Sequence, residues 1–270
     1  MTAIPLIRHD FWTFRIFEFA RAQKLVLNIL FLLFYSFFIL QFKTIDYIIY
    51  ATFILNLIYL IYQVFPYLPI AKKQIKSANQ SATPSIRLLV ANVYQYNREF
   101  HQLNDQILAE NPDIVLLVET DQWWKNQCLE NFAKQFPEQV LRDKENTYGM
   151  LLFSKLILSD TEVRYLIDEE IPSITTNVQL KNGDLIKLFA LHPVPPVPTQ
   201  NLYSTDRDAE ILLIGKEAKK ENLPVIVAGD LNDVAWSYTT NLFQKISGLL
   251  DPRRGRGFYS TFHAQKPLFR

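Results

Sequence analysis

The most uniform hydrophobic pattern in the chain lies in its first third. Residues 25–42 contain no charged side chain, and residues 47–71 contain none either. Each run approaches the ~20 apolar residues that an α-helix needs to cross the core of a bilayer. We therefore expect two transmembrane helices, at about 25–42 and 47–67. They should form an antiparallel hairpin, because only the short segment 41–46 lies between them.

Basic residues lie on both outer flanks of this hairpin, while its turn holds only one: Arg8, Arg15, Arg21, Lys24, Lys72, Lys73 and Lys76 against Lys43. Lys and Arg concentrate on the cytoplasmic side of membrane helices. We therefore expect both ends to be cytoplasmic in an integral protein of the cell inner membrane. A cleaved signal peptide is disfavoured, because a long segment precedes the first run, no small-residue cleavage site follows it, and a second apolar run comes at once.

The segments beside the hairpin complete this first part. Residues 1–22 mix phenylalanine with arginine, which is typical of an amphipathic helix on the inner membrane surface or of an extension of the first helix. Residues 72–85 are small and polar and predict a linker. The expected organisation is a membrane segment over 1–71, the linker, and a folded domain over 86–270.

After residue 85 the pattern alternates between short apolar runs and helical spacing. The runs at 86–93, 114–118, 148–155, 162–166, 174–180, 185–191 and 224–229 predict strands. Helical spacing predicts helices over 97–111 and 207–221 and a shorter one around 123–136. Asn182-Gly183 between two runs predicts a β-hairpin. The order strand, helix, strand indicates an α/β (α+β) domain.

The composition of the chain mainly excludes certain classes of partner and of site. The chain has 28 Lys+Arg against 27 Asp+Glu, so its net charge favours neither nucleic acid nor any other charged partner. Its single cysteine, Cys128, excludes an internal disulfide framework and a multi-cysteine zinc site.

Polar side chains follow four of the predicted strands at the point where each strand ends. They are Asn92, Glu119, His192, and Asp230 with Asn232. Any one of them alone is typical of a cap or turn. If the strand ends meet at one sheet edge, two carboxylates, two amides and an imidazole suit a divalent metal and a phosphate ester. Glu119 is the natural hard-oxygen ligand for Mg²⁺ or Mn²⁺.

The order and spacing of these residues resemble the endonuclease/exonuclease/phosphatase superfamily, the fold of pancreatic deoxyribonuclease, abasic-site endonucleases, neutral sphingomyelinases and inositol polyphosphate phosphatases. The resemblance covers about residues 86–270. It rests on Leu-Val-Ala-Asn92-Val, Asn-Pro-Asp-Ile-Val-Leu-Leu-Val-Glu119-Thr, Tyr-Gly-Met-Leu-Leu-Phe-Ser-Lys, Leu-His192-Pro and Val-Ala-Gly-Asp230-Leu-Asn232-Asp. It implies a four-layer α/β/β/α sandwich of two packed mixed sheets. The preceding two-helix transmembrane hairpin is similar to that of a bacterial membrane-anchored subgroup.

The resemblance also implies roles. Glu119 would bind Mg²⁺ or Mn²⁺ with Asn92 close by, His192 would contact the scissile phosphate, Asp230 would orient the attacking water, and Asn232 would hold a phosphate oxygen. The expected protein is a membrane-anchored, Mg²⁺-dependent phosphoesterase. It would hydrolyse phosphodiester or phosphomonoester bonds, and nuclease activity falls within this expectation. Its partners would be the lipid bilayer and a phosphate-ester substrate, whether nucleic acid, phospholipid or small molecule. The sequence indicates no protein partner.

The pattern departs from the family near the end of the sequence. Members continue after a segment like Pro267-Leu268-Phe269-Arg270 into a strand with an Asp and a last strand ending in Ser-Asp-His, which supplies the general base. The sequence stops at Arg270, and His263 lies in a segment that does not match. We therefore expect a C-terminally truncated domain that lacks its last strands.

Three functional interpretations stay open at this point. They are a phosphoesterase, a catalytically impaired homologue that binds phosphorylated ligands without turnover, and a membrane scaffold with an ordinary α/β domain. Arg253-Arg254-Gly255-Arg256 is either a basic rim for nucleic acid near the cleft or a solvated loop.

Overall fold

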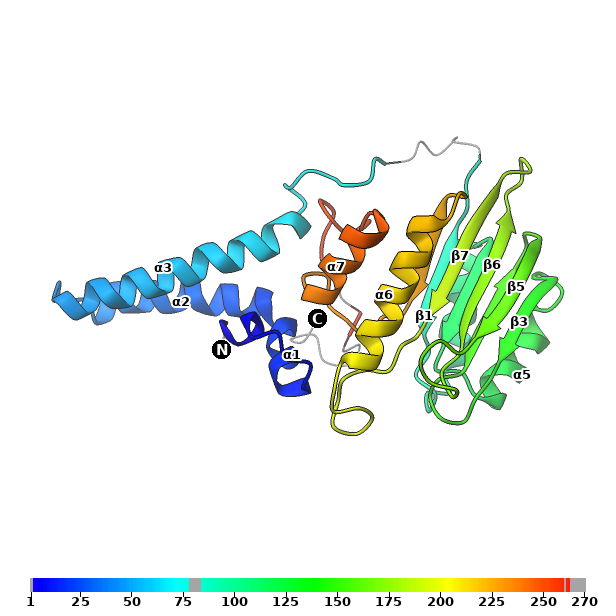
Figure 1. Cartoon of the computed structure of the whole chain (residues 1–270), viewed down its shortest axis with the longest axis horizontal. Coiled ribbons are helices and arrows are strands. Elements are labelled where there is room, and N and C mark those ends of the chain that lie inside the picture. The colour runs from blue at the N-terminus through cyan, green and yellow to red at the C-terminus, as the bar shows by residue number, and fades with distance from the viewer. Residues whose placement is uncertain (1, 78–83, 260, 263–270) are drawn as a thin grey trace.

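A hairpin of two long helices projects from a layered α/β body in the computed structural model, which describes residues 2–77, 84–259 and 261–262 (Figure 1). The helices are α2, Arg21–Phe38, and α3, Thr44–Val64. Both are long and apolar enough to cross a membrane, and only 17% and 11% of their apolar windows are buried. Each begins slightly before the start predicted from the sequence. Their exposed apolar surface is unlike that of a soluble core helix.

A short helix precedes the hairpin and packs against the body. After the 3₁₀ turn η1, Ile4–Leu6, helix α1 spans Trp12–Phe19 and ends at Ala20 before α2 begins. Arg15 Nη2 donates to Asp208 Oδ2 at 3.0 Å, and Trp236 Nε1 donates to the Glu18 carbonyl at 2.6 Å. The two sequence interpretations of residues 1–22 did not anticipate this docking, because both partners lie about two hundred residues further along the chain.

The chain after α3 also contacts the body. Tyr67, at the end of the 3₁₀ turn η2, Phe65–Tyr67, donates its hydroxyl hydrogen to the Ala235 carbonyl at 2.7 Å. Gln74 accepts from the Asp251 amide at 2.9 Å, and the Ile75 carbonyl accepts from Arg256 at 2.8 Å. Residues 72–77, the described start of the predicted linker, are therefore held by the C-terminal loop.

The first sheet has the strand order β1-β2-β4-β3. Its strands are β1, Leu88–Asn92; β2, Ile114–Val118; β3, Glu138–Arg142; and β4, Met150–Ser154. β1 and β2 are parallel, and the other pairs are antiparallel. Helices α4, Phe100–Glu110, and α5, Gln122–Phe132, connect its strands. Asn111, with φ of 45°, ends α4, and the Asp121 side chain caps the start of α5.

The second sheet has the order β5-β6-β7-β8. Its strands are β5, Leu158–Arg164; β6, Ser173–Gln179; β7, Leu185–Leu191; and β8, Val225–Gly229. β6 and β7 form the hairpin predicted from Asn182-Gly183, and β7 and β8 are parallel. Helix α6, Thr205–Lys220, connects β7 to β8, and α7, Tyr238–Ser247, packs on α6.

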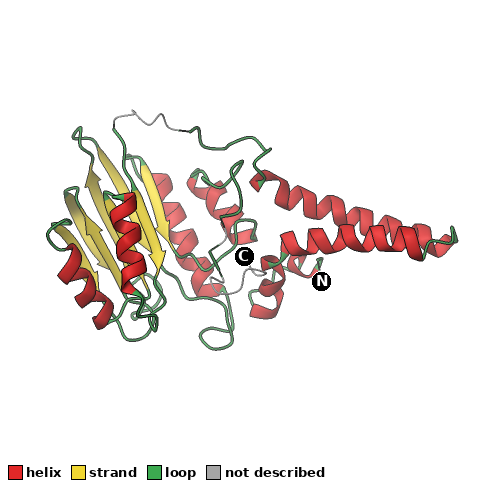
Figure 2. Cartoon of the chain, turned by 180° about the vertical axis from the view of Figure 1, so that it is seen from behind, coloured by secondary structure: helices red, strands yellow, loops and turns green. Residues whose placement is uncertain are grey.

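Three apolar layers separate four structural layers, so the predicted α/β/β/α sandwich of two mixed sheets is confirmed (Figure 2). The central layer lies between the sheets and includes Leu116, Leu152 and Leu188. The outer layers lie between the first sheet and the helices α4 and α5, and between the second sheet and α6. Because the sheets are packed face to face, the ends of their strands can form one rim.

One carboxyl group is buried in the α6 layer without compensation. Glu210 is 3% exposed, and its Oε1 has no hydrogen-bond partner among the described residues. Burial, with a smaller effect of the Asp168 carboxylate, raises the pKa of Glu210 from 4.5 to about 7. The folded chain therefore keeps a proton that the unfolded chain loses near pH 4.5. The free energy of unfolding therefore falls as the pH rises from 4.5 to about 7. Above pH 7 the ionisation of Glu210 causes no further change in it.

The variant Glu210→Gln stays neutral and should remove this pH dependence. Relative to wild type, its free energy of unfolding should gain about 3 kcal/mol between pH 4.5 and 7. Urea unfolding followed by tryptophan fluorescence over this pH range measures the difference. Parallel pH profiles for the two proteins would show that Glu210 ionises normally in the folded chain.

Candidate active site

The predicted site residues meet at one rim of the sandwich, where two parallel strand pairs end. Asn92 is paired in register with Val118 across β1 and β2, which places Asn92 beside Glu119. Leu191 is paired with Gly229 across β7 and β8, so the next residues, His192 and Asp230, are also neighbours. Each sheet therefore contributes two of the side chains.

The Asn92 amide connects the two sheets. Its Nδ2 donates to Glu119 Oε1 at 2.6 Å and to Asp230 Oδ2 at 3.0 Å, while its Oδ1 accepts from the Tyr94 amide at 3.0 Å. The two carboxylates therefore converge on one nitrogen. In this orientation Asn92 positions the carboxylates through its NH₂ group. Its predicted role as a metal ligand would require the amide to turn.

The loop after β8 is fixed by its own polar groups. Asp230 Oδ1 accepts from the Asn232 amide at 3.0 Å. The side chain of Asn232 donates from Nδ2 to the Pro193 carbonyl at 2.9 Å, which ties this loop to the one after β7. An amide NH₂ group has two hydrogens. Asn232 therefore keeps a second donor for the phosphate oxygen that the sequence assigned to it.

His192 is buried behind these carboxylates. It is 3% exposed, its ring lies 5.6 Å from the Tyr148 ring, and its Nδ1 has no hydrogen-bond partner in the described part of the chain. Burial holds the pKa of His192 below 6.5, against the attraction of Asp230 and Glu119. The imidazole is therefore neutral at pH 7, and it can donate one hydrogen bond without adding positive charge.

Two of the positive-φ residues of the described chain lie at the same rim. Glu119 and Asn232 have φ values of 60° and 50°, a region that non-glycine residues avoid at a cost of order 1 kcal/mol or more. Gly229 has φ of 136°, and a Cβ there would lie 1.8 Å from the Leu191 carbonyl oxygen. Only glycine therefore allows β8 to approach β7 closely enough to bring Asp230 beside His192. Such strain is common where side chains must be aimed at a ligand.

The residues present fit a hard divalent cation. Glu119 and Asp230 both lie within hydrogen-bond distance of one amide nitrogen, and carboxylate oxygens are the ligands that Mg²⁺ and Mn²⁺ prefer. Within the described ranges, no three His, Cys, Asp or Glu side chains gather as a metal-binding group. Mg²⁺ is commonly held by one or two carboxylates, with water and substrate phosphate as its other ligands.

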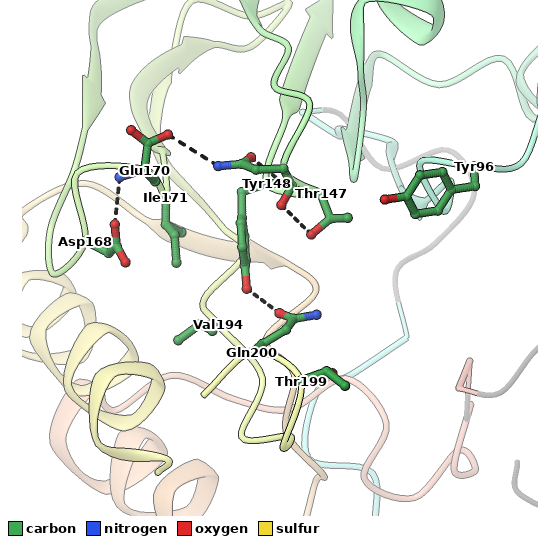
Figure 3. Close-up of a pocket in the computed structure, with 10 residues that line it drawn as sticks. Tyr96, Thr147, Tyr148, Asp168, Glu170, Ile171, Val194, Thr199 and Gln200 are labelled. Atoms are coloured by element: carbon green, nitrogen blue, oxygen red, sulfur yellow. Dashed lines mark hydrogen bonds between the residues drawn. The ribbon is translucent and has the colours of Figure 1, made fainter. Parts of the chain in front are cut away.

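A cavity of about 580 Å³ adjoins the site at Tyr148, whose ring contacts His192 (Figure 3). Asp168 and Glu170 line it together with Tyr96 and Gln200. Glu170 accepts from Lys144 Nζ at 2.6 Å, and Tyr148 donates to Gln200. The sequence predicted the segment with Tyr148 as a strand and as one of the motifs of the family resemblance, but it gave Tyr148 no role, and the acidic segment 168–170 carried no signal beyond loop polarity.

Arg207 is a further residue that the sequence did not indicate. Its side chain is 0% exposed and lies beneath the loop after β8. It donates to the Asn232 carbonyl at 2.8 Å and to Asp208 Oδ1 at 2.7 Å, and its Nη1 lies 3.5 Å from Asp233 Oδ1. Arg207 therefore holds the backbone of the loop that carries Asp230 and Asn232.

Neither interpretation of the arginine cluster at 253–256 is correct. Arg253 is paired with Asp251 at 2.7 Å, Arg254 lies 5.6 Å over the Tyr67 ring, and Arg256 donates to the Ile75 carbonyl. The cluster holds the segment that follows α3, so it is neither a rim of the strand-end site nor a solvated loop. His263 lies outside the described residues.

Comparisons with known proteins identify the family to which the chain is similar. Residues 89–270 match the model of the Endonuclease/Exonuclease/phosphatase family. Similar solved structures include a beta toxin mutant from Staphylococcus aureus (20% identity, 62% of this chain and 74% of that chain, TM-score 0.49) and sphingomyelinase C from Streptomyces griseocarneus (18%, 63% and 72%, 0.49). The human Nocturnin catalytic domain is similar at 16% identity (60% and 70%, 0.48). Another beta toxin structure contains bound magnesium ions. No curated protein sequence matches the chain.

Proposed function

Because the chain belongs to the endonuclease/exonuclease/phosphatase family, we propose that it is a membrane-anchored, divalent-cation-dependent phosphoesterase. The observation that carries this proposal is the meeting of Asn92, Glu119, His192 and Asp230 at one rim of the two sheets. Two carboxylates, an amide and a neutral imidazole that meet at one place suit the binding of a divalent cation and the positioning of a phosphate ester for hydrolysis.

The proposed roles follow from the geometry of each side chain. Glu119 and Asp230 would hold the cation, which supplies stabilisation of the negative charge on the phosphoryl oxygens. Asp230 orients the attacking water, because two hydrogen bonds fix its carboxylate. His192 donates to a non-bridging phosphate oxygen, and Asn232 donates to another. Water then forms a new P–O bond while the ester P–O bond breaks in line; the attacking water releases a proton to solvent, and the leaving alcohol oxygen takes one up from solvent.

The cavity beside the site indicates the class of substrate. Among the described residues, its walls include two carboxylates and no lysine or arginine; Glu170 is paired with Lys144 at 2.6 Å, and Asp168 forms no ion pair. A nucleic acid places a phosphate on every nucleotide and needs a basic surface. The acidic lining therefore favours a single phosphate ester whose remaining part is neutral or cationic. Nuclease activity is the less favoured option within the same reaction class.

The experiment that tests the function uses the full chain in lipid nanodiscs with bis(p-nitrophenyl) phosphate. We expect hydrolysis that depends on Mg²⁺ and falls by at least ~10²-fold in Asp230→Asn. Direct binding of a non-hydrolysable phosphonate separates turnover from ligand binding alone. Binding without hydrolysis would favour the catalytically impaired alternative. Equal hydrolysis by wild type and Asp230→Asn would remove Asp230 from the reaction.

Membrane anchoring with both ends in the cytoplasm is the second part of the proposal. It is supported by the exposed apolar surface of α2 and α3 and by the excess of Lys and Arg outside their turn. A fluorescent protein fused after Arg270 should therefore fluoresce, and alkaline phosphatase fused there should be inactive. The same fusions after Lys43, in the turn, should behave in the opposite way. An active phosphatase after Arg270 would reverse the orientation.

A further inference from the structure

A second cavity lies between the end of the membrane hairpin and the body. It has a volume of about 840 Å³, within the range of small-molecule sites. Tyr62 and Tyr67 line it from the end of α3 and from η2, and Leu242 and Lys245 line it from α7. None of its lining residues belongs to the strand-end site, and the proposed reaction does not use it. Figure 1 shows α7 next to the domain-proximal end of α3.

The walls of this cavity carry positive charge without compensating carboxylates. Arg8, Lys245 and Arg254 line it, and none of its lining residues is Asp or Glu. Neither Arg8 nor Lys245 forms an ion pair in the described part of the chain, and the Arg8 guanidinium lies 4.7 Å over the Tyr238 ring. The Nε of Arg254 is buried without a hydrogen-bond partner there. An anion is the ligand that this arrangement lacks.

The place of the cavity in the fold indicates which anion. It lies at the end of two apolar helices, where the headgroups of a bilayer would lie if the hairpin spans it. Tyr62 is 75% exposed and Leu250 is 52% exposed at its edge. Tyrosine is enriched at the level of lipid headgroups, and an exposed leucine beside a cationic cavity suits an acyl chain. A free phosphate would use neither residue.

We propose that this cavity binds the phosphate headgroup of an anionic phospholipid of the cytoplasmic leaflet. The proposal rests on the membrane anchoring proposed above. Lys245 and Arg8 contact the headgroup phosphate, Tyr62 lies at the headgroup level, and Leu250 faces the acyl chains. A bound lipid would connect α7 and the loop carrying Arg254 to the membrane, which fixes how the body sits on the bilayer.

The test measures lipid bound to the full chain by native mass spectrometry after purification in detergent. Phosphatidylglycerol should bind at least tenfold more tightly than phosphatidylcholine. The double variant Arg8→Gln, Lys245→Glu should lose that preference, because each cation near a membrane surface contributes about fivefold in affinity. Lys245→Arg should keep it. Lys134→Glu is the control for a charge reversal elsewhere on the surface, because this exposed lysine follows α5 at the far end of the molecule.

Three outcomes would overturn the proposal. They are equal affinity for the two lipids, an unchanged preference in the double variant with an unchanged melting temperature, and displacement of the lipid by inorganic phosphate. Extraction of the chain from membranes by alkaline carbonate is measured in parallel. A protein that resists extraction but shows no lipid preference refutes the lipid site alone. A protein that is extracted refutes the anchoring, and the lipid site with it.

Discussion

Replacing Glu119 with glutamine should lower phosphoesterase turnover by about 10³-fold or more. The glutamine keeps the size of the side chain and can still accept a hydrogen bond from Asn92. It removes the negative charge that would hold a divalent cation, and loss of the charge stabilisation from such an ion costs several kcal/mol in the transition state. The loss should appear in turnover of bis(p-nitrophenyl) phosphate by the full chain in nanodiscs.

A second readout separates the site from the reaction. Binding of Mn²⁺ by wild type, measured by electron paramagnetic resonance, should weaken strongly in Glu119→Gln, while the melting temperature changes little because this side chain is only partly buried. Glu169→Gln is the matched control, because Glu169 is exposed in the loop before β6. Retained turnover together with unchanged Mn²⁺ binding in Glu119→Gln would contradict the assignment of Glu119.

The sequence predicts best those strands that are buried on both faces. β2 and β4 consist of fully buried residues, so their apolar runs are continuous and easily recognised. β3 was missed because it is a partly exposed edge strand that pairs only with β4, and its sequence Glu-Gln-Val-Leu-Arg has no apolar run. α7 was missed although Ser237 before it and Gly248 after it are typical helix-terminating residues, and its Phe243 packs against Gly215 of α6.

The candidate site was predictable to the extent that it depends on where strands end. Asn92, Glu119, His192 and Asp230 each follow an apolar run, and parallel pairing brings them together. Contacts across long sequence separations gave no such signal. Arg15 contacts Asp208, which lies 193 positions later, and a lone arginine on an amphipathic segment resembles a residue that faces lipid headgroups. The same limitation concealed Arg207.

Arg207→Met should produce the largest loss of stability that we expect from a single substitution. The guanidinium is fully buried and is the partner of Asp208 and Asp233, whose side chains are 15% and 2% exposed. Breaking a buried ion pair by removing one partner costs about 3–5 kcal/mol, because the remaining charge is left without compensation. For a domain of this size that loss corresponds to a fall in melting temperature of roughly 6–20 °C.

The matched control is Arg164→Met, which removes an equally well-formed arginine pair between the end of β5 and α6. Arg164 binds Glu217 through two hydrogen bonds of 2.6 and 2.7 Å, but both side chains are about a third exposed or less. Solvent screens such a pair, so its loss should cost about 1 kcal/mol or less. Differential scanning fluorimetry of the full chain in detergent compares the two variants.

Arg207→Met should also lower turnover at a temperature where it is still folded, because the Asn232 carbonyl loses its donor and the loop with Asp230 is no longer held. Equal melting temperatures for the two variants would show that the contacts of Arg207 with Asp208 and Asp233 do not stabilise the fold more than the surface pair does.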